Sequence, residues 1–255
     1  MQTFYLTDTG KVREHNEDSV IILNNSSNEY ILAVADGMGG HKAGEVASAI
    51  AINHLTEEFY RLDKIGPKEA AIYWLRNIVT EINNKIFEYT KENEDSKGMG
   101  TTLVCAIKTQ DYLLYGNIGD SSGFVIKNKK LHKVTKDHTL VNLLVSTGEL
   151  TEEEAKYHPR RNVLMRALGA NNPIDIDIFD VDPKIDGIFL CSDGLTNMLD
   201  KDQIEKVLLE DSDIEEKVIK LIQKANNRGG TDNISVAYLI RDMEGEVEWF
   251  QRGKK

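Results

Sequence analysis

The chain has 255 residues, of which 40% are hydrophobic and 29% are charged, and its formal net charge is -11. These proportions are those of an ordinary globular protein, so a disordered chain is not expected. Proteins that bind nucleic acid normally carry a basic face, and no run rich in lysine or arginine occurs here, so no nucleic-acid partner is expected. The acidic excess fits either a solvated surface or carboxylates grouped around metal ions.

No apolar run approaches the ~20 residues that span a bilayer, and the first residues lack the pattern of a signal peptide. Cys105 and Cys191 both lie in apolar stretches. This favours buried free thiols in a reducing compartment, although their spacing alone leaves a disulfide open. We therefore expect a cytoplasmic protein that does not bind membranes.

The first half of the chain predicts strands at 3–7, 20–23 and 30–35, helices at 43–60 and 67–89, and strands at 101–108, 112–118, 121–127 and 130–134. The second helix is the clearest element. Its apolar residues, among them Leu75, Ile78, Ile82 and Ile86, recur at steps of three and four and form one buried stripe. The short polar or glycine breaks between the later strands favour antiparallel hairpins.

The second half predicts helices at 139–147 and 151–157, an irregular basic stretch at 157–169, strands at 174–181 and 187–191, helices at 203–209 and 213–227, and a last strand at 234–240. No linker or repeat divides the chain, so we expect one domain over residues 1–242, followed by a polar tail at 243–255. Runs of strands and runs of helices favour an α+β fold over a parallel sheet with strict strand–helix alternation.

Five aspartates flanked by glycine or small residues stand at the ends or beginnings of predicted strands: Asp18, Asp36, Asp120, Asp193 and Asp232. Each alone is explained by a turn, since aspartate tolerates turn geometry. Strands that share a sheet edge can bring such carboxylates together, and like charges at close range resist ionisation unless cations are present. Because the donors are all oxygens, the pattern favours Mg²⁺ or Mn²⁺ over Zn²⁺.

The motifs at residues 10–18, 36–41, 119–121, 192–194 and 230–233 occur in an order that resembles the bacterial type 2C protein phosphatases, the metal-dependent serine/threonine class. The resemblance covers residues 3–240. It implies a four-layer sandwich, in which two central antiparallel β-sheets are flanked by α-helices on both outer faces.

The resemblance also implies two core Mn²⁺ or Mg²⁺ ions that are bridged by a water and by Asp36. The carbonyl of Gly37 is expected on one ion, and Asp193 and Asp232 on the other. Asp120 together with Asp193 matches the position of a third, looser ion.

Asp18 is also expected among the metal-binding residues, largely through water. The resemblance places Glu17 near the ions in the same way, and Asn233 is expected to support the ligands from outside.

In the mechanism that this implies, a hydroxide formed between the two ions attacks phosphorus in line with the leaving serine or threonine oxygen. The predicted catalytic residues are Arg13, Asp36 and Asp193. Arg13 is the candidate that grips the phosphoryl oxygens, because a guanidinium offers paired donors. The alternative for Arg13 is a surface ion pair with Glu14 or Glu17.

The chain departs from the family pattern at two positions. Met38 stands where eukaryotic relatives carry a histidine proposed as general acid, and methionine cannot donate a proton. His41 is a possible substitute, with a metal-bound water or a role in holding the glycine loop as alternatives. Ser122 stands where many bacterial members have an arginine.

The stretch 146–169 corresponds to the mobile flap of the family. Its basic side chains, His158, Arg160, Arg161 and Arg166, could meet an anionic substrate or balance the acidic residues at 152–154. We favour the second role for Arg166 and leave both open for Arg160 and Arg161.

The predicted function is hydrolysis of phosphoserine and phosphothreonine esters in phosphorylated proteins, by a monomer that opposes a bacterial serine/threonine kinase. Two alternatives remain. One is a metal-binding pseudo-phosphatase that acts as a scaffold, which should lack at least one core ligand. The other is a two-metal nuclease or phosphodiesterase, which the acidic net charge disfavours.

Overall fold

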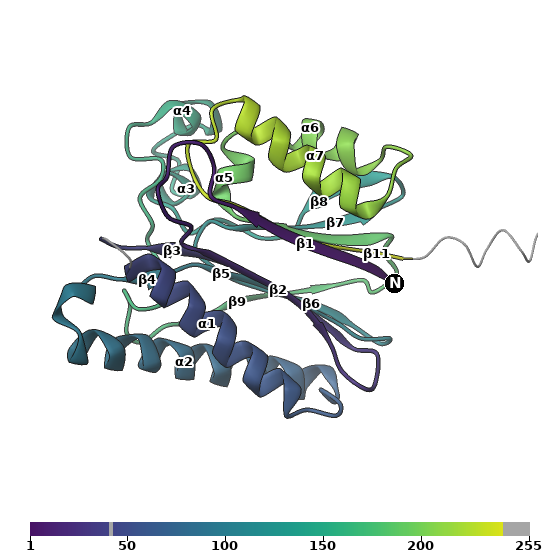
Figure 1. Ribbon diagram of the computed structural model, residues 1–255, viewed down its shortest axis with the longest axis horizontal. Coiled ribbons are helices and arrows are strands. Elements are labelled where there is room, and N and C mark those ends of the chain that lie inside the picture. Colours follow the sequence, from purple (N-terminus) through teal and green to yellow (C-terminus); the bar gives the residue numbers. More distant parts are fainter. Residues whose placement is uncertain (41–42, 242–255) are drawn as a thin grey trace, which may run out of the picture.

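Residues 1–40 and 43–241 are described by the computed structural model, and their strands form two antiparallel sheets that pack face to face. Helices cover the outer face of each sheet (Figure 1). The predicted four-layer α+β sandwich is therefore confirmed.

One sheet has the strand order β1-β11-β10-β7-β8. Its strands are β1 (Gln2–Asp8), β7 (Ser122–Lys127), β8 (Lys130–Lys133), β10 (Gly187–Cys191) and β11 (Ile234–Ile240). Its outer face is covered by α5 (Asp193–Thr196), α6 (Lys201–Leu208) and α7 (Ile214–Asn227) (Figure 1).

The other sheet has the order β2-β3-β5-β6-β9, with β4 paired to β3. Its strands are β2 (Asp18–Asn24), β3 (Tyr30–Met38), β4 (Gly100–Thr101), β5 (Leu103–Lys108), β6 (Leu113–Ile118) and β9 (Asp177–Val181). Two long helices, α1 (Ala43–Tyr60) and α2 (Lys68–Glu92), cover its outer face (Figure 1). The short elements η1 (Glu94–Ser96), α3 (Leu140–Ser146) and α4 (Glu152–Tyr157) lie outside the layers.

The period of two along the strands divides the core into separate layers. On β3, Ile31 and Ala33 pack toward the helices α1 and α2, whereas Leu32 and Val34 pack between the two sheets. Successive side chains of a strand point to opposite faces, so a strand in the middle of such a sandwich must be apolar on both. This explains why β3 and β5 are continuous apolar runs rather than alternating ones.

Three details differ from the sequence prediction. The predicted strand 101–108 is interrupted at Thr102, where β4 ends and β5 begins. The short helix α5 was not predicted. β5 pairs with β6 and β7 pairs with β8, as hairpins should, but the chain crosses from one sheet to the other between β6 and β7. Gly119 lies in this crossing with a φ of 98°, a value that glycine adopts without strain.

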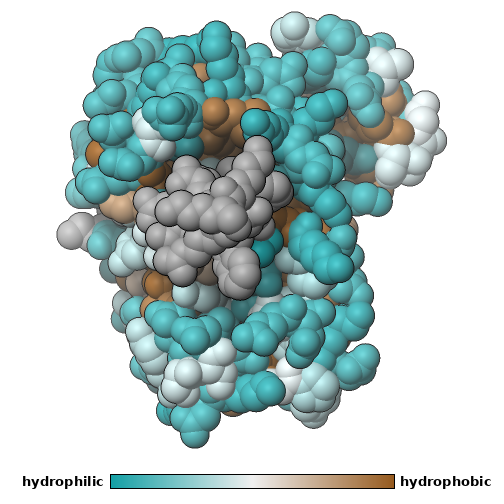
Figure 2. Space-filling view, turned by 90° about the vertical axis from the view of Figure 1, so that its right-hand side faces the viewer, coloured by the Kyte–Doolittle hydropathy of each residue, from teal (hydrophilic) through white to brown (hydrophobic). Residues whose placement is uncertain are grey.

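The two cysteines lie in different core layers. Cys105 packs under the α1–α2 helices and Cys191 under α5–α7, and both are free and buried, as predicted. Among the described residues, no helix combines the length and apolar character required to cross a bilayer. The end of the sandwich that carries the N-terminus is mostly hydrophilic where Figure 2 colours it.

Candidate active site

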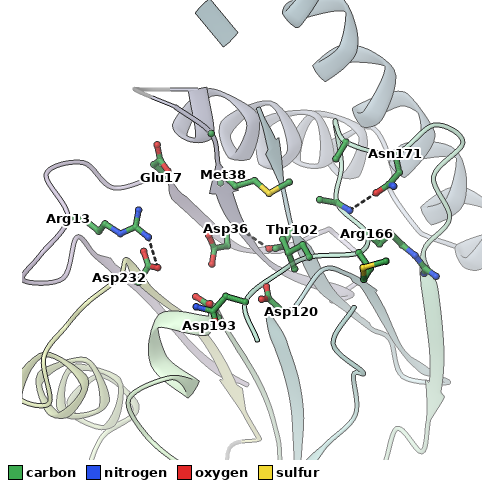
Figure 3. Close-up of a pocket in the computed structure, with 17 residues that line it drawn as sticks. Arg13, Glu17, Asp36, Met38, Thr102, Asp120, Arg166, Asn171, Asp193 and Asp232 are labelled. Carbon is green, nitrogen blue, oxygen red and sulfur yellow. Dashed lines mark hydrogen bonds and ion pairs between the residues drawn. The ribbon is translucent and has the colours of Figure 1, made fainter. Parts of the chain in front are cut away.

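The predicted carboxylates converge because, in an antiparallel sheet, one strand ends where its neighbour begins, so both termini lie at the same end of the sheet. Asp18 begins β2 and lies directly opposite Asp36, near the end of β3. On the facing sheet, Asp193 follows β10, and Asp232 precedes the neighbouring strand β11. Since the two sheets pack face to face, the four carboxylates come from both layers to one end of the sandwich. Figure 3 shows three of them, Asp36, Asp193 and Asp232.

Asp120 joins this group through the crossing between the sheets. Gly119 and Asp120 follow the end of β6, and Ser121 then leads into β7. The position of Asp120 therefore depends on both sheets. Thr102, at the break between β4 and β5, accepts a hydrogen bond from the backbone N–H of Asp36 (3.0 Å), and its hydroxyl lies 2.8 Å from that of Ser121. A single threonine side chain thereby connects the loops that carry Asp36 and Asp120.

Asp18 lies beneath the others and is 7% exposed. Its Oδ2 accepts a hydrogen bond from the Ser192 hydroxyl at 2.7 Å, and that hydroxyl in turn accepts from the backbone N–H of Ser235 at 2.9 Å. Asp18 is thus held by residues of the facing sheet.

Asn233 fixes the loop between β1 and β2. Its side-chain amide donates to the carbonyl oxygens of Thr9 and His15, both at 2.9 Å, and its Oδ1 accepts from the backbone N–H of Glu17 at 2.8 Å. Asn233 therefore holds the backbone of this loop, and its predicted support of the metal ligands stays a prediction. Glu17 itself lines the cavity.

Gly37 permits a close approach of the same loop. Its N–H donates to the carbonyl of Glu17 at 3.1 Å, and a Cβ at this position would overlap the backbone oxygens of Glu17 and Gly44. The position therefore requires glycine, independently of any ligand role of its carbonyl.

Arg13 stands at the rim of the site. Its Nη2 donates to Oδ2 of Asp232 at 2.7 Å, and its side chain is 48% exposed (Figure 3). The alternative prediction of an ion pair with Glu14 or Glu17 is therefore wrong about the partner, which is Asp232. Arg13 is accordingly placed beside the carboxylates with a guanidinium that still reaches solvent.

The site contains a cavity of about 430 Å³, and Asp18 is not among the described residues that line it. One side is formed by Arg13, Glu17 and the carboxylates, and the other by the chain at 162–171 (Figure 3). Its polar walls and its size suit a charged group on an extended ligand.

Burial and mutual repulsion raise the pKa of the carboxyl groups. Burial, with the nearby charges of Asp193 and Asp232, raises the pKa of Asp18 to about 7. Burial, with Asp193 next in size, raises the pKa of Asp120 to about 7 as well. Burial is also the main cause that raises the pKa of Asp36 and Asp193. Perturbed groups that gather in one cavity are typical of functional sites.

The residues fit divalent cations. Oδ1 of Asp18 and Oδ1 of Asp193 are buried and have no hydrogen-bond partner among the described residues. Buried carboxylate oxygens are normally hydrogen-bonded or bound to metal, and here every candidate donor is an oxygen. Hard cations such as Mg²⁺ and Mn²⁺ prefer such a set.

A second group of possible metal donors lies away from this site. His54 and Glu58 on α1 and Glu81 on α2 have donor atoms within 4.8 Å of one another. Nε2 of His54 lies 2.8 Å from a carboxylate oxygen of Glu81, and Glu58 pairs with Arg61. One contact between the helices and one local ion pair at the end of α1 account for this group, and none of the predicted ligands belongs to it.

Other predicted residues are placed as follows. Met38 lines the cavity, and His41 lies outside the described residues. Ser122 is 1% exposed. Arg166 lines the cavity and pairs with Asp177 at 2.6 Å, so its anion partner is not the acidic run 152–154. The backbone N–H of Arg160 donates to the ring of His158.

Three residues that organise the site were assigned no role from the sequence. Ser192 stands in the motif 192–194, but nothing in that motif predicts its contact with Asp18, and Thr102 is an ordinary hydroxyl residue beside an apolar strand. The third is His138, whose Nδ1 accepts from the N–H of Gly119 at 3.1 Å and whose backbone N–H donates to the carbonyl of Gly119 at 2.9 Å. His138 therefore fixes the residue that precedes Asp120.

Comparison with known proteins agrees with the geometry. The sequence profile of the protein phosphatase 2C family matches residues 10–232. The serine/threonine phosphatase stp of Listeria monocytogenes is 42% identical over 244 residues, which are 95% of this chain and 97% of that protein. Protein phosphatase PhpP of Streptococcus pneumoniae is 35% identical over 247 residues, 96% of this chain and 99% of that one.

Solved structures give the same result. The serine/threonine phosphatase Stp1 from Staphylococcus aureus superimposes with a TM-score of 0.89 and 36% identity, covering 94% of this chain and 95% of that chain. The serine/threonine phosphatase PstP/Ppp of Mycobacterium tuberculosis gives a TM-score of 0.83 and 34% identity, covering 94% and 99%.

Proposed function

The chain belongs to the protein phosphatase 2C family of metal-dependent protein serine/threonine phosphatases, and we propose from this premise that it hydrolyses phosphoserine and phosphothreonine esters by in-line attack of hydroxide on phosphorus. One observation carries the proposal: carboxylates from both sheets meet in one cavity, with a guanidinium at its rim. We further propose that the substrates are cytoplasmic phosphoproteins, that a cognate serine/threonine kinase phosphorylates them, and that the enzyme is a monomer.

We assign the core metal ligands to Asp36, the Gly37 carbonyl, Asp193 and Asp232, with Asp18 beneath them. Asp120 with Asp193 is assigned to a third ion. When bound, two Mn²⁺ or Mg²⁺ ions supply the positive charge that neutralises these carboxylates and makes a nearby water more acidic. Oδ1 of Asp18 and Oδ1 of Asp193 have no hydrogen-bond partner in the part of the chain that the structure describes, and this supports the assignment. A carboxylate oxygen that is buried without a partner destabilises the protein, and a bound cation would offset that cost.

The chain's own groups bind and orient the substrate. Arg13 is assigned to two phosphoryl oxygens, and its exposure of 48% allows the guanidinium to turn from Asp232 toward a ligand in the cavity. Its fork of donors fixes the direction of the phosphorus–oxygen bonds, which in-line displacement requires. The buried Ser192 hydroxyl donates to the Asp18 carboxylate, and the Thr102 hydroxyl accepts from the backbone N–H of Asp36.

The proton for the leaving oxygen needs a separate donor. Met38 lines the cavity but carries no acidic hydrogen. We retain His41, three residues further on, as the candidate. We also take residues 146–169 as the flap, within a single domain that spans residues 1–242.

Release of phosphate from a phosphothreonine peptide in Mn²⁺ tests the proposal. We expect turnover by the wild-type chain and none by a folded Asp193→Asn variant. A folded, Mn²⁺-loaded wild-type protein without turnover would favour the pseudo-phosphatase scaffold. Cleavage of single- or double-stranded DNA or RNA under the same conditions would favour the phosphodiesterase.

A further inference from the structure

The cavity wall that faces Arg13 is a stretch of irregular chain. Leu164, Met165, Arg166 and Ala167 line the cavity, as do Ala170 and Asn171 beyond the turn at Gly169 (Figure 3). These residues lie between α4 and β9, and no helix or strand of the described chain includes them. Their backbone groups must therefore be held by contacts with other parts of the molecule.

Asn83 supplies two of these contacts from the middle of α2. Its Nδ2 donates to the carbonyl of Asn171 at 3.0 Å, and its Oδ1 accepts from the N–H of Gly169 at 2.8 Å. The partners fix the orientation of the amide, because a carbonyl can only accept and an N–H can only donate. Asn83 is 1% exposed, so water does not replace either bond.

The wall is seated directly on the helix at this point. Gly169 has a φ of 81°, and a Cβ there would lie 2.5 Å from Cγ2 of Ile86 and 2.8 Å from the carbonyl oxygen of Met99. The side chain of Asn171 closes the turn by accepting from the N–H of Ala167 at 3.0 Å. The bonds of Asn83 thus hold a turn that has no room to shift toward α2.

The same wall is connected to the carboxylates. Leu168 and Thr101 exchange two backbone hydrogen bonds, of 3.0 and 2.9 Å, and the Thr101 hydroxyl donates to the carbonyl oxygen of Asp36 at 2.9 Å. A second connection runs from the N–H of Met165 to the carbonyl oxygen of His138 at 2.8 Å, and His138 in turn holds Gly119. A shift of the turn would therefore act directly on a ligand that extends along residues 164–171, and on the carboxylates only through intervening residues such as Thr101 and His138.

We propose that Asn83 is a positioning residue that fixes residues 164–171 at the distance from Arg13 that a phosphopeptide requires. This inference rests on the proposed function. Asn83 touches neither the carboxylates nor the cavity, so it acts through the wall alone. An asparagine is suited to the position because its amide offers a donor and an acceptor on a short, buried side chain.

Asn83→Ala removes both bonds and tests the inference with two substrates. We expect KM for a phosphothreonine peptide to rise roughly tenfold with little change in kcat, since ground-state positioning is lost. For p-nitrophenyl phosphate, which has no peptide chain to extend along the wall, kcat/KM should change less than about twofold. Val79→Ala, one turn earlier on α2 and also 1% exposed, is the matched control for a loss of core packing.

Amide hydrogen exchange provides a readout that does not depend on turnover. Exchange at Gly169 should accelerate in Asn83→Ala and stay at the wild-type rate in Val79→Ala. If Asn83→Ala does not fold, Asn83→Ser, which keeps a shorter donor and acceptor, serves in its place.

Equal losses on both substrates, or the same kinetics in the asparagine and valine variants, would overturn the positioning role and leave Asn83 as a structural residue. Wild-type protein inactive on both substrates would instead overturn the proposed function, and with it the substrate side of this inference.

Discussion

Substitution of Asp18 should show how much the repulsion within the carboxylate cluster lowers the free energy of unfolding. Burial first, and then the charges of Asp193 and Asp232, raise the pKa of Asp18 from an ordinary value of 3.8 to about 7. A difference of roughly three pKa units corresponds to about 4 kcal/mol between the two protonation states. Metal-free protein at pH 8, where Asp18 is ionised, therefore carries this cost.

Asp18→Asn removes the charge and keeps an oxygen that accepts from the Ser192 hydroxyl. The new amide, imperfectly paired, costs about 1–2 kcal/mol. We expect the variant to be about 2–3 kcal/mol more stable than wild type at pH 8 in chelator, although it loses a residue assigned to metal binding.

The sign of the pH dependence follows from the raised pKa. Between pH 4 and 7 the folded protein holds a proton on Asp18 that the unfolded chain has released, so wild-type stability falls as pH rises through this range. The stability that the folded protein gains by keeping Asp18 protonated is fully present below about pH 4 and is lost above about pH 7. The advantage of Asp18→Asn should accordingly shrink as the pH is lowered from 8 toward 5.

Urea unfolding in EDTA at pH 8 and pH 5 measures this difference, with Asp211→Asn, an exposed aspartate outside the cluster, as the control. Addition of Mn²⁺ should stabilise wild type by mass action and the variant less. A variant that is no more stable than wild type at pH 8, or an advantage that does not depend on pH, would show that Asp18 is not under charge repulsion in the folded protein.

Four further outcomes are expected. Asp193→Asn should lower phosphopeptide turnover more than about 100-fold while circular dichroism stays native, because it removes a metal ligand; near-normal turnover would take Asp193 out of the metal site. Chelation should stop turnover and Mn²⁺ should restore it, and turnover that persists after exhaustive chelation would contradict a metal mechanism. Arg13→Ala should raise KM for small phosphoesters about tenfold or more, as expected for a lost charge-assisted hydrogen bond, and unchanged kinetics would make Arg13 a surface residue. Burial raises the pKa of the Cys105 thiol to about 12 and that of Cys191 well above its usual range, so iodoacetamide should label neither in the native protein and both in guanidinium; labelling of the native protein would contradict their burial.

Local patterns in the sequence predicted an α+β fold and the gathering of the aspartates, whereas the four-layer sandwich was implied by the resemblance to the phosphatase family. Strand periodicity, turn glycines and the stripe on α2 are visible in short windows, and antiparallel pairing brings the ends of neighbouring strands to one edge. The order of the motifs then identified which aspartates belong together. The residues of the site that were named in advance are aspartates near the ends of predicted strands and residues within the family's ordered motifs.

The remaining contacts depend on long-range packing and have no local signature. Thr102, Ser192 and Asn83 reach partners 66, 174 and 88 residues away in the sequence. The crossing at Gly119 resembles a hairpin turn in the sequence, and only the division of strands between two sheets shows that it is not one. Asn83 lies within an amphipathic helix, where a single polar residue on the buried stripe looks like an imperfection of the pattern.

The structure also explains how a buried aspartate can be retained at the base of the site. Asp18 is attached to the sheet of β2 and β3 through its backbone, and to the facing sheet through Ser192 and Ser235. A buried carboxylate at this junction destabilises the folded chain when no cation accompanies it. Under the metal assignment proposed above, the same residue would contribute affinity for the ion, and folding and metal binding would be coupled through the interface between the sheets. A substitution that relieves the repulsion should then weaken that coupling in proportion.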